Sequence, residues 1–204
     1  MYKEVIQCIR SIVNEYSDIQ LVDSILNSVN DNQVKNKEWL TESLEKYYEN
    51  IKEFPDLEGL PKTVLAAGWY GLAGHFIKKK YDTEVTSFDM DPICKIIGQK
   101  IFPNIRFQTS TIEEFNPRQY QIIICTSCEH ISDKVINDFI AKKHPAAIVI
   151  LQSNNYFSVE DHINCKNSLV EFENSINLKK LWSEQKNFGE YDRYMFIGSA
   201  IIES

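Results

Sequence analysis

Short apolar runs alternate with longer segments from residue 63 to residue 151, and this alternation limits the possible folds more than any other feature. The runs have the length of strands, and the segments between them are long enough for helices or loops. Strands that alternate with helices form parallel βαβ units. The sequence therefore predicts an α/β fold with a doubly wound, mostly parallel, Rossmann-like sheet. Its expected strands are Thr63–Ala67, Glu84–Phe88, Ile105–Phe107, Gln121–Cys125 and Ala146–Leu151.

The end of the chain departs from this alternation. Two strand-like segments, Leu178–Glu184 and Arg193–Ile201, are joined by the turn-prone stretch Lys186–Asp192, which contains Gly189. A parallel pair of strands needs a crossover connection of a dozen or more residues, and this stretch is too short for one. The sequence therefore predicts an antiparallel C-terminal hairpin.

The first quarter of the chain has a helical pattern of apolar residues. It predicts an N-terminal helical cap over residues 1–58, followed by a Rossmann-like domain over residues 59–204. Three helices are expected in the cap, and Asp18 stands where the second would start. We expect the polar stretch Asn30–Lys37 to be the connection to the third helix, which Pro55 would end.

The expected third helix carries three large aromatic residues, Trp39, Tyr47 and Tyr48. They could cover a substrate pocket and exclude water from it, or they could pack in the hydrophobic core. Large aromatic side chains bury much apolar area and commonly dominate cores. Core packing is therefore the expected role.

The chain has 204 residues and a formal net charge of −7. A surface of that sign repels phosphate backbones, which argues against nucleic acid and favours small molecules or proteins as partners. No run approaches eighteen apolar residues, and we expect no membrane span or signal peptide. The five scattered cysteines predict reduced thiols in a cytoplasmic protein.

Three of the seven glycines, Gly68, Gly71 and Gly74, fall within seven positions. They follow the first expected strand and open the expected helix Leu72–Lys80. Glycine at a strand-to-helix turn permits a sharp bend and a close approach of a ligand to the backbone. The alternative is a tight turn with close packing of the helix on the strand.

Asp89 lies 21 residues after Gly68, at the end of the second expected strand. A carboxylate at this place can accept hydrogen bonds from both hydroxyls of a ribose. Asp91-Pro92 is expected to cap the next helix, with Pro92 at its first position. We therefore expect Asp89, rather than Asp91, to bind the ribose of a nucleotide-type cofactor.

With these features the chain resembles the class I S-adenosylmethionine-dependent methyltransferases. The matching stretches are VLAAGWYGLAGHFI (64–77), VTSFDMDP (85–92), IRFQTSTIEEF (105–115) and YQIIICTSCEHI (120–131). The resemblance covers roughly residues 60–204. The expected hairpin also looks like the antiparallel last strand of that family.

The resemblance implies S-adenosyl-L-methionine as the cofactor. In the family, the first glycine loop packs on the methionine part, the acid that ends the second strand holds the ribose, and the loop after the third strand reads the adenine. The cofactor-binding positions implied here are Ala67, Gly68, Trp69, Tyr70, Gly71, Asp89, Met90, Ser110, Thr111 and Thr126.

The ends of the fourth and fifth expected strands lie where the methyl group and its acceptor would meet. There His130 or Glu129 could act as a general base, with His130 the first choice, or the pair could simply start the next helix. Asn155 and Tyr156 could orient a small polar substrate. Arg193 could bind a carboxylate or phosphate, or form an ion pair with Asp192 or another acid.

Cys125 and Cys128 form a C-x-x-C pair, and His130, His162 and Cys165 could complete a zinc site. However, Cys125 ends an apolar strand, where cysteine commonly serves as a small buried hydrophobe. No second C-x-x-C is present in the sequence. We therefore expect no metal.

These features together predict a methyltransferase that acts on an O, N or S nucleophile of a small molecule, with a protein as the second candidate substrate. One alternative is a non-catalytic binding subunit, because Ala66-Ala67 stand where the family often has an acidic residue, and Ser110-Thr111 replace its usual Asp. The other alternative is a nicotinamide-dependent oxidoreductase. The missing G-x-G-x-x-G and the expected hairpin argue against it.

Overall fold

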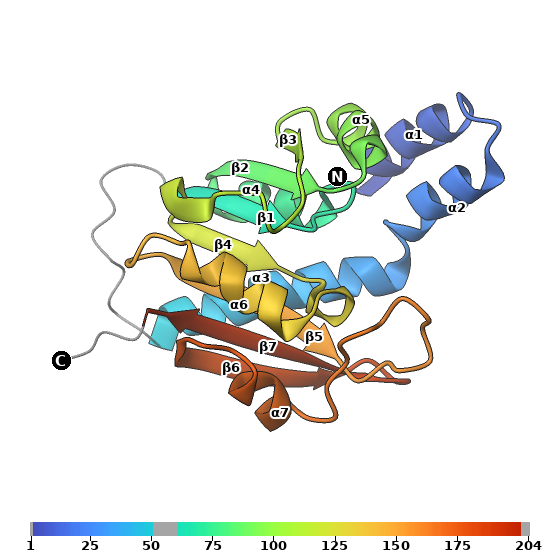
Figure 1. The fold of residues 1–204 in the computed structure, drawn as a ribbon. Helices are drawn as coiled ribbons and strands as arrows, with labels where there is room; N and C mark the ends of the chain where they lie inside the picture. The colour runs from blue at the N-terminus through green and yellow to red at the C-terminus, as the bar shows by residue number, and fades with distance from the viewer. Residues whose placement is uncertain (1, 51–60, 201–204) are drawn as a thin grey trace.

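The computed structural model describes residues 2–50 and 61–200, which build one seven-stranded sheet covered by helices (Figure 1). The sheet has the order β3-β2-β1-β4-β5-β7-β6, in which β1 to β5 are parallel and β7 runs antiparallel to β5 and β6. This confirms the expected Rossmann-like α/β fold and its hairpin. The strands are β1 (Lys62–Ala66), β2 (Glu84–Asp89), β3 (Arg106–Thr109), β4 (Ile122–Cys125), β5 (Ile148–Asn154), β6 (Lys179–Asn187) and β7 (Asp192–Ser199).

Helices form a hydrophobic core on each face of the sheet, because alternate residues of a strand point to opposite faces. In β4, Ile122 and Ile124 join the first core, whereas Ile123 and Cys125 join the second. The first core contains residues of α1 (Tyr2–Val13), α2 (Ile19–Asn27), α3 (Asp31–Asn50), α4 (Leu72–Tyr81) and α5 (Pro92–Ile101). The second contains residues of α6 (Asp133–Ala141) and α7 (Leu169–Asn174).

Two aspartates cap helices as the sequence predicts. The carboxylate of Asp18 accepts hydrogen bonds from the backbone N–H groups of Gln20 and Leu21 at the start of α2. The carboxylate of Asp91 accepts one from Ile93 N, and Pro92 occupies the first position of α5. Both caps satisfy backbone donors that have no partner within the helix.

The polar stretch Asn30–Lys37 is not a connection, and this expectation is wrong. It opens α3, where the side chain of Asn30 accepts a hydrogen bond from Gln33 N. Asn36 and Lys37 are buried, although they lie in a segment of low hydrophobicity. The segment was expected to be a loop because its residues are polar. A helix can nevertheless bury polar side chains where they face a polar cavity. The expected end of the helix at Pro55 lies outside the described residues.

The fifth strand extends further than the sequence predicts. Gln152–Asn154, expected to be part of an exit loop, continue β5, pair with Arg193–Met195 of β7 and are buried. The antiparallel partner supplies the backbone hydrogen bonds that keep these polar residues in the strand. The hairpin turn is correspondingly shorter than Lys186–Asp192, because β6 runs to Asn187 and β7 begins at Asp192.

The aromatic residues of α3 pack in the core, as expected. Trp39 and Tyr47 are only 1% and 3% exposed, and Tyr48 packs against the same cluster. The Trp39 ring meets Phe188 edge-to-face, with the ring centroids 5.9 Å apart. These contacts fasten α3 to the sheet.

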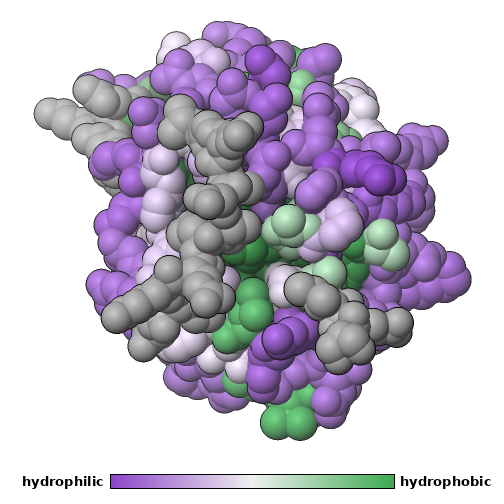
Figure 2. Space-filling view, turned by 90° about the vertical axis from the view of Figure 1, so that its left-hand side faces the viewer, coloured by the Kyte–Doolittle hydropathy of each residue, from purple (hydrophilic) through white to green (hydrophobic). Residues whose placement is uncertain are grey.

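Hydrophilic residues predominate on the face seen in Figure 2, with a small hydrophobic area near its centre. This face lies at the amino ends of the parallel strands, opposite the carboxyl ends where doubly wound sheets bind ligands. No helix within residues 2–50 or 61–200 is long and apolar enough to cross a membrane.

Replacing Trp39 by alanine should destabilise the protein by about 3–5 kcal/mol, because it removes a fully buried aromatic side chain. Urea denaturation measures the loss, and Ile96→Ala, at a half-exposed position, is the control that should cost far less. A Trp39→Ala variant of unchanged stability would contradict the packing role of this residue.

Candidate functional site

Two cavities adjoin at the carboxyl ends of the parallel strands. The outer cavity, about 760 Å³, lies beside the ends of β2 and β3. The inner cavity, about 250 Å³, lies between α3, the loop after β1 and the ends of β4, β5 and β7. Ala67, Trp69, Ser127 and His130 line both cavities. A ligand bound in one could therefore reach the other past these residues.

The carboxylate of Asp89 lines the outer cavity at the end of β2. Its Oδ2 accepts a hydrogen bond from Trp69 N (3.0 Å), and its Oδ1 accepts one from Asp91 N (3.2 Å). Each carboxylate oxygen can accept more than one hydrogen bond, so both retain capacity for a ligand. The carboxylate of Asp91 instead serves the cap of α5.

The rest of the outer cavity combines hydroxyl groups with apolar side chains. Ser110 and Thr111 line it just after β3. The Ser110 hydroxyl donates to Thr111 O, and Thr111 Oγ1 accepts from the backbone N–H of Glu114, so both hydroxyls already have local partners. Met90 and Ile163, 73% and 71% exposed, line the same cavity. Two exposed apolar side chains beside a cavity suit the face of a flat ring.

A Cβ added to either of two glycines in the loop after β1 would meet other protein atoms. A Cβ on Gly68 would meet Ser87 Oγ at 2.1 Å, and a Cβ on Gly71 would meet the Phe107 ring at 2.5 Å. Gly71 also has a φ of 89°, which favours glycine. Ala67 and Trp69, both with a φ of 48°, line the two cavities, and Gly68 lines the inner one. The two glycines thus let the loop pack tightly beside the cavities.

Tyr70 connects this loop to the N-terminal helices. Its buried ring stacks on Trp69, with the centroids 5.4 Å apart, and it lines the inner cavity. Its hydroxyl is hydrogen-bonded to Ser24 Oγ of α2 at 3.0 Å. The position of the loop is therefore coupled to that of α2.

A buried lysine from α3 reaches the end of β4. Lys37 lines the inner cavity, and its Nζ donates a hydrogen bond to Thr126 Oγ1 at 3.0 Å. Burial is the main cause that lowers the pKa of Lys37 to about 7, and the nearby Arg193 lowers it as well, against the opposite effect of Glu129. A neutral amine is therefore well populated at Lys37 near neutral pH.

Glu129 and Arg193 form a buried ion pair, with 3.4 Å between Arg193 Nη1 and Glu129 Oε1. Arg193 Nη2 also donates to Thr126 O, and Asn154 Nδ2 donates to Glu129 Oε1 at 2.8 Å. Arg193 thus pairs with Glu129, one of the expected alternatives, and not with Asp192. Glu129 Oε2 is buried and has no hydrogen-bond partner among the described residues.

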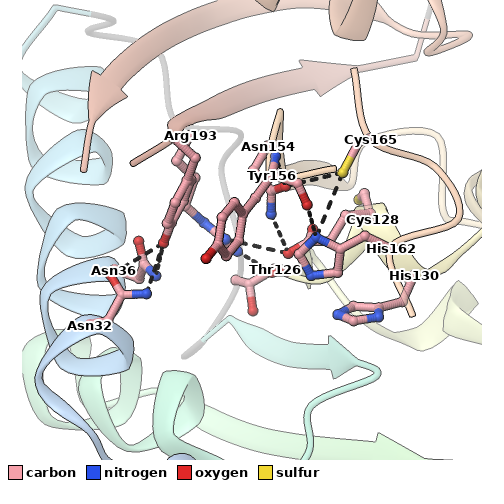
Figure 3. A network of polar contacts seen from close by, with 12 residues as sticks. Asn32, Asn36, Thr126, Cys128, His130, Asn154, Tyr156, His162, Cys165 and Arg193 are labelled. Atoms are coloured by element: carbon pink, nitrogen blue, oxygen red, sulfur yellow. Dashed lines mark hydrogen bonds and ion pairs between the residues drawn. The ribbon is translucent and has the colours of Figure 1, made fainter. Parts of the chain in front are cut away.

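His130 lies in the short 3₁₀ helix η2 (Cys128–His130), close to His162 (Figure 3). The two imidazole rings are 4.6 Å apart and nearly perpendicular. His130 Nδ1 is 3.0 Å from Asp161 O, and His162 Nδ1 is 2.8 Å from Tyr156 O. Both histidines line the inner cavity. The structure thus brings His130, an expected catalytic residue, next to His162, which the sequence suggested only as a possible zinc ligand.

Asn155 and Tyr156, the other expected catalytic residues, differ in their placement. Asn155 Oδ1 accepts a hydrogen bond from Asp192 N at 2.7 Å, and Asn155 is not among the residues that line either cavity. Tyr156 lines the inner cavity, where its ring stacks on Tyr191 with the centroids 5.0 Å apart. Its hydroxyl is 3.0 Å from Glu190 Oε2.

The C-x-x-C pair is packed within the protein. Cys125 and Cys128 are both buried, and Cys128 Sγ lies 3.8 Å from Cys125 O. Neither belongs to a cluster of three or more potential metal ligands within the described part of the chain. The cluster found there consists of Glu129, His130 and His162, with one ligand atom of each within 4.8 Å of the others.

Sequence reasoning missed the residues that α3 brings to the inner cavity: Asn32, Gln33, Asn36 and Lys37. Asn32 and Asn36 both contact the hydroxyl of Tyr191. The signal was the i, i+4 spacing of these polar residues, which places them on one face of a helix. That spacing could have identified a helix with a polar face.

No protein-family model and no curated protein matches the amino-acid sequence. Solved structures do match the fold. The plantazolicin methyltransferase BpumL, solved with S-adenosylhomocysteine and a pentazolic desmethylPZN analog, has a TM-score of 0.67 at 11% identity, over 98% of this chain and 100% of its own. Magnesium protoporphyrin IX methyltransferase from Synechocystis, solved with bound S-adenosylmethionine, has a TM-score of 0.65 at 12% identity, over 95% and 97%.

A TehB-like methyltransferase from Corynebacterium glutamicum has a TM-score of 0.58 at 12% identity, and the match covers 94% of this chain and 100% of that one. In each case nearly the whole of both chains is aligned, so the N-terminal helices and the C-terminal hairpin belong to the shared architecture. The chain therefore has the fold of the class I S-adenosylmethionine-dependent methyltransferases.

Proposed function

We propose that this protein transfers a methyl group from S-adenosylmethionine to an O, N or S nucleophile of a small molecule. The observation that carries the proposal is the position of Asp89. Its carboxylate lines the large outer cavity at the end of β2, next to the loop that leads to the inner cavity. This is where a doubly wound sheet binds the ribose of a nucleotide.

The residues present suit the parts of such a cofactor. Asp89 would accept the ribose hydroxyls, and the exposed side chains of Met90 and Ile163 would contact the adenine ring. Ala67 and Trp69, which line both cavities, would lie along the path from the adenosine to the methionine part. The bound cofactor supplies an electrophilic methyl group on its sulfonium.

The chain's own residues would position the acceptor in the inner cavity and exclude water from it. The volume of about 250 Å³, bounded by α3 and the ends of β4, β5 and β7, suits a small molecule. We propose that residues 1–58 form a cap that covers the inner cavity and excludes water, over a domain of residues 59–204. In-line alignment of a bound nucleophile is the main contribution that a protein makes to such a reaction.

Lys37 is the residue we propose to take the proton of the acceptor. It lies in the inner cavity and, at a pKa of about 7, is available as a neutral amine. His130, Glu129 and Tyr156 also face this cavity and would orient the acceptor. Asn155 accepts a hydrogen bond from the backbone of Asp192 at the start of β7, so it would affect the reaction only by positioning this strand.

Buried charged groups support catalysis over the alternative of a non-catalytic binding subunit. Lys37, Glu129 and Arg193 are all buried around one small cavity, and burying charge costs free energy. Perturbed, buried ionisable groups cluster at functional sites. The antiparallel β7 likewise supports methyl transfer over nicotinamide-dependent oxidoreduction.

Replacing Asp89 by alanine should weaken binding of S-adenosylhomocysteine on the order of 2–4 kcal/mol, since hydrogen bonds to a charged acceptor contribute about 1.5–3 kcal/mol each. Asp91→Ala is the matched control. It should lower the melting temperature through loss of the α5 cap, but leave the affinity nearly intact. Isothermal titration calorimetry compares the two, and equal affinities in both variants and the wild type would refute the role of Asp89.

The pH dependence of stability tests Lys37 without a known acceptor. The folded pKa of about 7 lies below the ordinary value of 10.5, so between these pH values the unfolded chain binds the additional proton. The free energy of unfolding should therefore rise with pH across this window, by up to about 1.4 kcal/mol per pH unit. Urea denaturation of the wild type and of Lys37→Met from pH 7 to 10 isolates this contribution. Parallel pH profiles of the two proteins would show that Lys37 titrates normally.

A further inference from the structure

Three side chains meet at the wall of the inner cavity: Glu129 is buried, His162 is partly buried and His130 is exposed. Glu129, His130 and His162 each offer one ligand atom within 4.8 Å of the other two. They come from different parts of the fold, since the first two lie in η2 and His162 lies in the loop after β5. Figure 3 shows the two imidazole rings side by side next to this loop.

The hydrogen bonds around the two histidines determine which nitrogen is free. Nδ1 of His130 contacts the carbonyl oxygen of Asp161, and Nδ1 of His162 contacts that of Tyr156. A carbonyl oxygen can only accept a hydrogen bond, so Nδ1 of each neutral ring carries the hydrogen. Nε2 of each ring is then left with a lone pair. Metal-binding histidines are held in this way, by a backbone carbonyl on the other nitrogen.

The carboxylate of Glu129 is likewise held through one oxygen, and its other oxygen is free. Its Oε1 is held by Asn154 Nδ2 at 2.8 Å and by Arg193, whereas its Oε2 is buried without a partner among the described residues. A buried carboxylate oxygen without a hydrogen bond costs free energy. Each of the three side chains is thus held by a hydrogen bond on one atom. The other atom, Nε2 of each histidine and Oε2 of Glu129, has a free lone pair that could bind a metal ion.

We propose that Glu129, His130 and His162 bind a divalent transition-metal ion of the zinc type. Two imidazoles and one carboxylate form a recurrent metal-binding set that leaves further coordination positions open. Hard ions such as Mg²⁺ or Ca²⁺ prefer sets of oxygen ligands, and two of the three side chains here are imidazoles. Imidazole nitrogen instead favours Zn²⁺ and its neighbours in the transition series.

The ion would face the inner cavity, because all three side chains line it. Its open positions could hold an oxygen or nitrogen atom of the methyl acceptor and so fix that atom's orientation. This consequence rests on the proposed methyl transfer, whereas metal binding does not. The acceptor class it indicates is a small molecule with a metal-binding hydroxyl, carbonyl or amine group beside the methylated atom.

The test uses the full chain, stripped of metal with a chelator and titrated with Zn²⁺ and Co²⁺. We expect one equivalent of either ion to bind and Mg²⁺ not to compete. His162→Ala should weaken binding more than about 100-fold, since loss of a group that only supports a ligand already costs about 10–100-fold. His144→Ala removes an exposed histidine and is the matched control. Glu129→Gln, which retains the size of the side chain, should also weaken binding.

The absorption spectrum of the Co²⁺ protein identifies the ligands. Nitrogen and oxygen ligands give no thiolate charge-transfer band, so the absence of this band would exclude Cys165, whose Sγ lies 3.6 Å from His162 Nδ1, as a ligand. The proposal is overturned if neither ion binds, if binding survives His162→Ala, or if it depends on a cysteine. Melting temperatures of the variants show that each is folded. S-adenosylhomocysteine affinity, measured on the same samples, separates the two proposals, because a metal-free wild type that still binds this ligand leaves methyl transfer standing.

Discussion

The buried ion pair between Glu129 and Arg193 holds the site together. It joins η2, which follows β4, to β7, and the backbone carbonyl of Thr126 and the side chain of Asn154 complete the network. Removing one member of a buried pair leaves an uncompensated charge, which typically costs about 3–5 kcal/mol. The C-terminal hairpin is therefore more than an edge of the sheet, because it supplies the guanidinium that fixes the carboxylate of the site.

The pair also explains the shape of the inner cavity. Asn154 reaches Glu129 because β5 continues through Gln152–Asn154, and it continues because β7 pairs with it there. Lys37 enters from α3 on the other side and bonds to the side chain of Thr126, whose carbonyl Arg193 already holds. Elements that are distant in sequence thus converge on the residues just after β4.

The sequence alone predicted the features that depend on local patterns. Alternating apolar runs predicted the strands, the short spacing of the last two predicted the hairpin, and Asp18 and Asp91 were recognised as helix caps. The place of Asp89 at the end of β2 was predicted too. Each of these follows from a spacing or a residue type within one or two neighbouring elements.

The features that depend on tertiary pairing were not predictable in this way. The polar end of β5 resembles a loop until its partner in β7 is known, and the start of α3 resembles a connection until the cavity it faces is known. In both segments, buried polar groups take the place of the apolar residues that periodicity detects. Lys37 was missed for this reason. The proximity of His162 to His130 depends on the path of the loop after β5, which no local pattern shows.

If the outer cavity and Asp89 bind the adenosyl part of S-adenosylmethionine, with the methyl-bearing end directed toward the inner cavity, calorimetric titration of the wild-type protein with S-adenosylhomocysteine, adenosine and NAD should distinguish the three ligands. S-adenosylhomocysteine should bind at one equivalent and more tightly than adenosine, because its homocysteine part would contact the loop after β1, and NAD should not bind. Binding of NAD without binding of S-adenosylhomocysteine would contradict this assignment of the cavities.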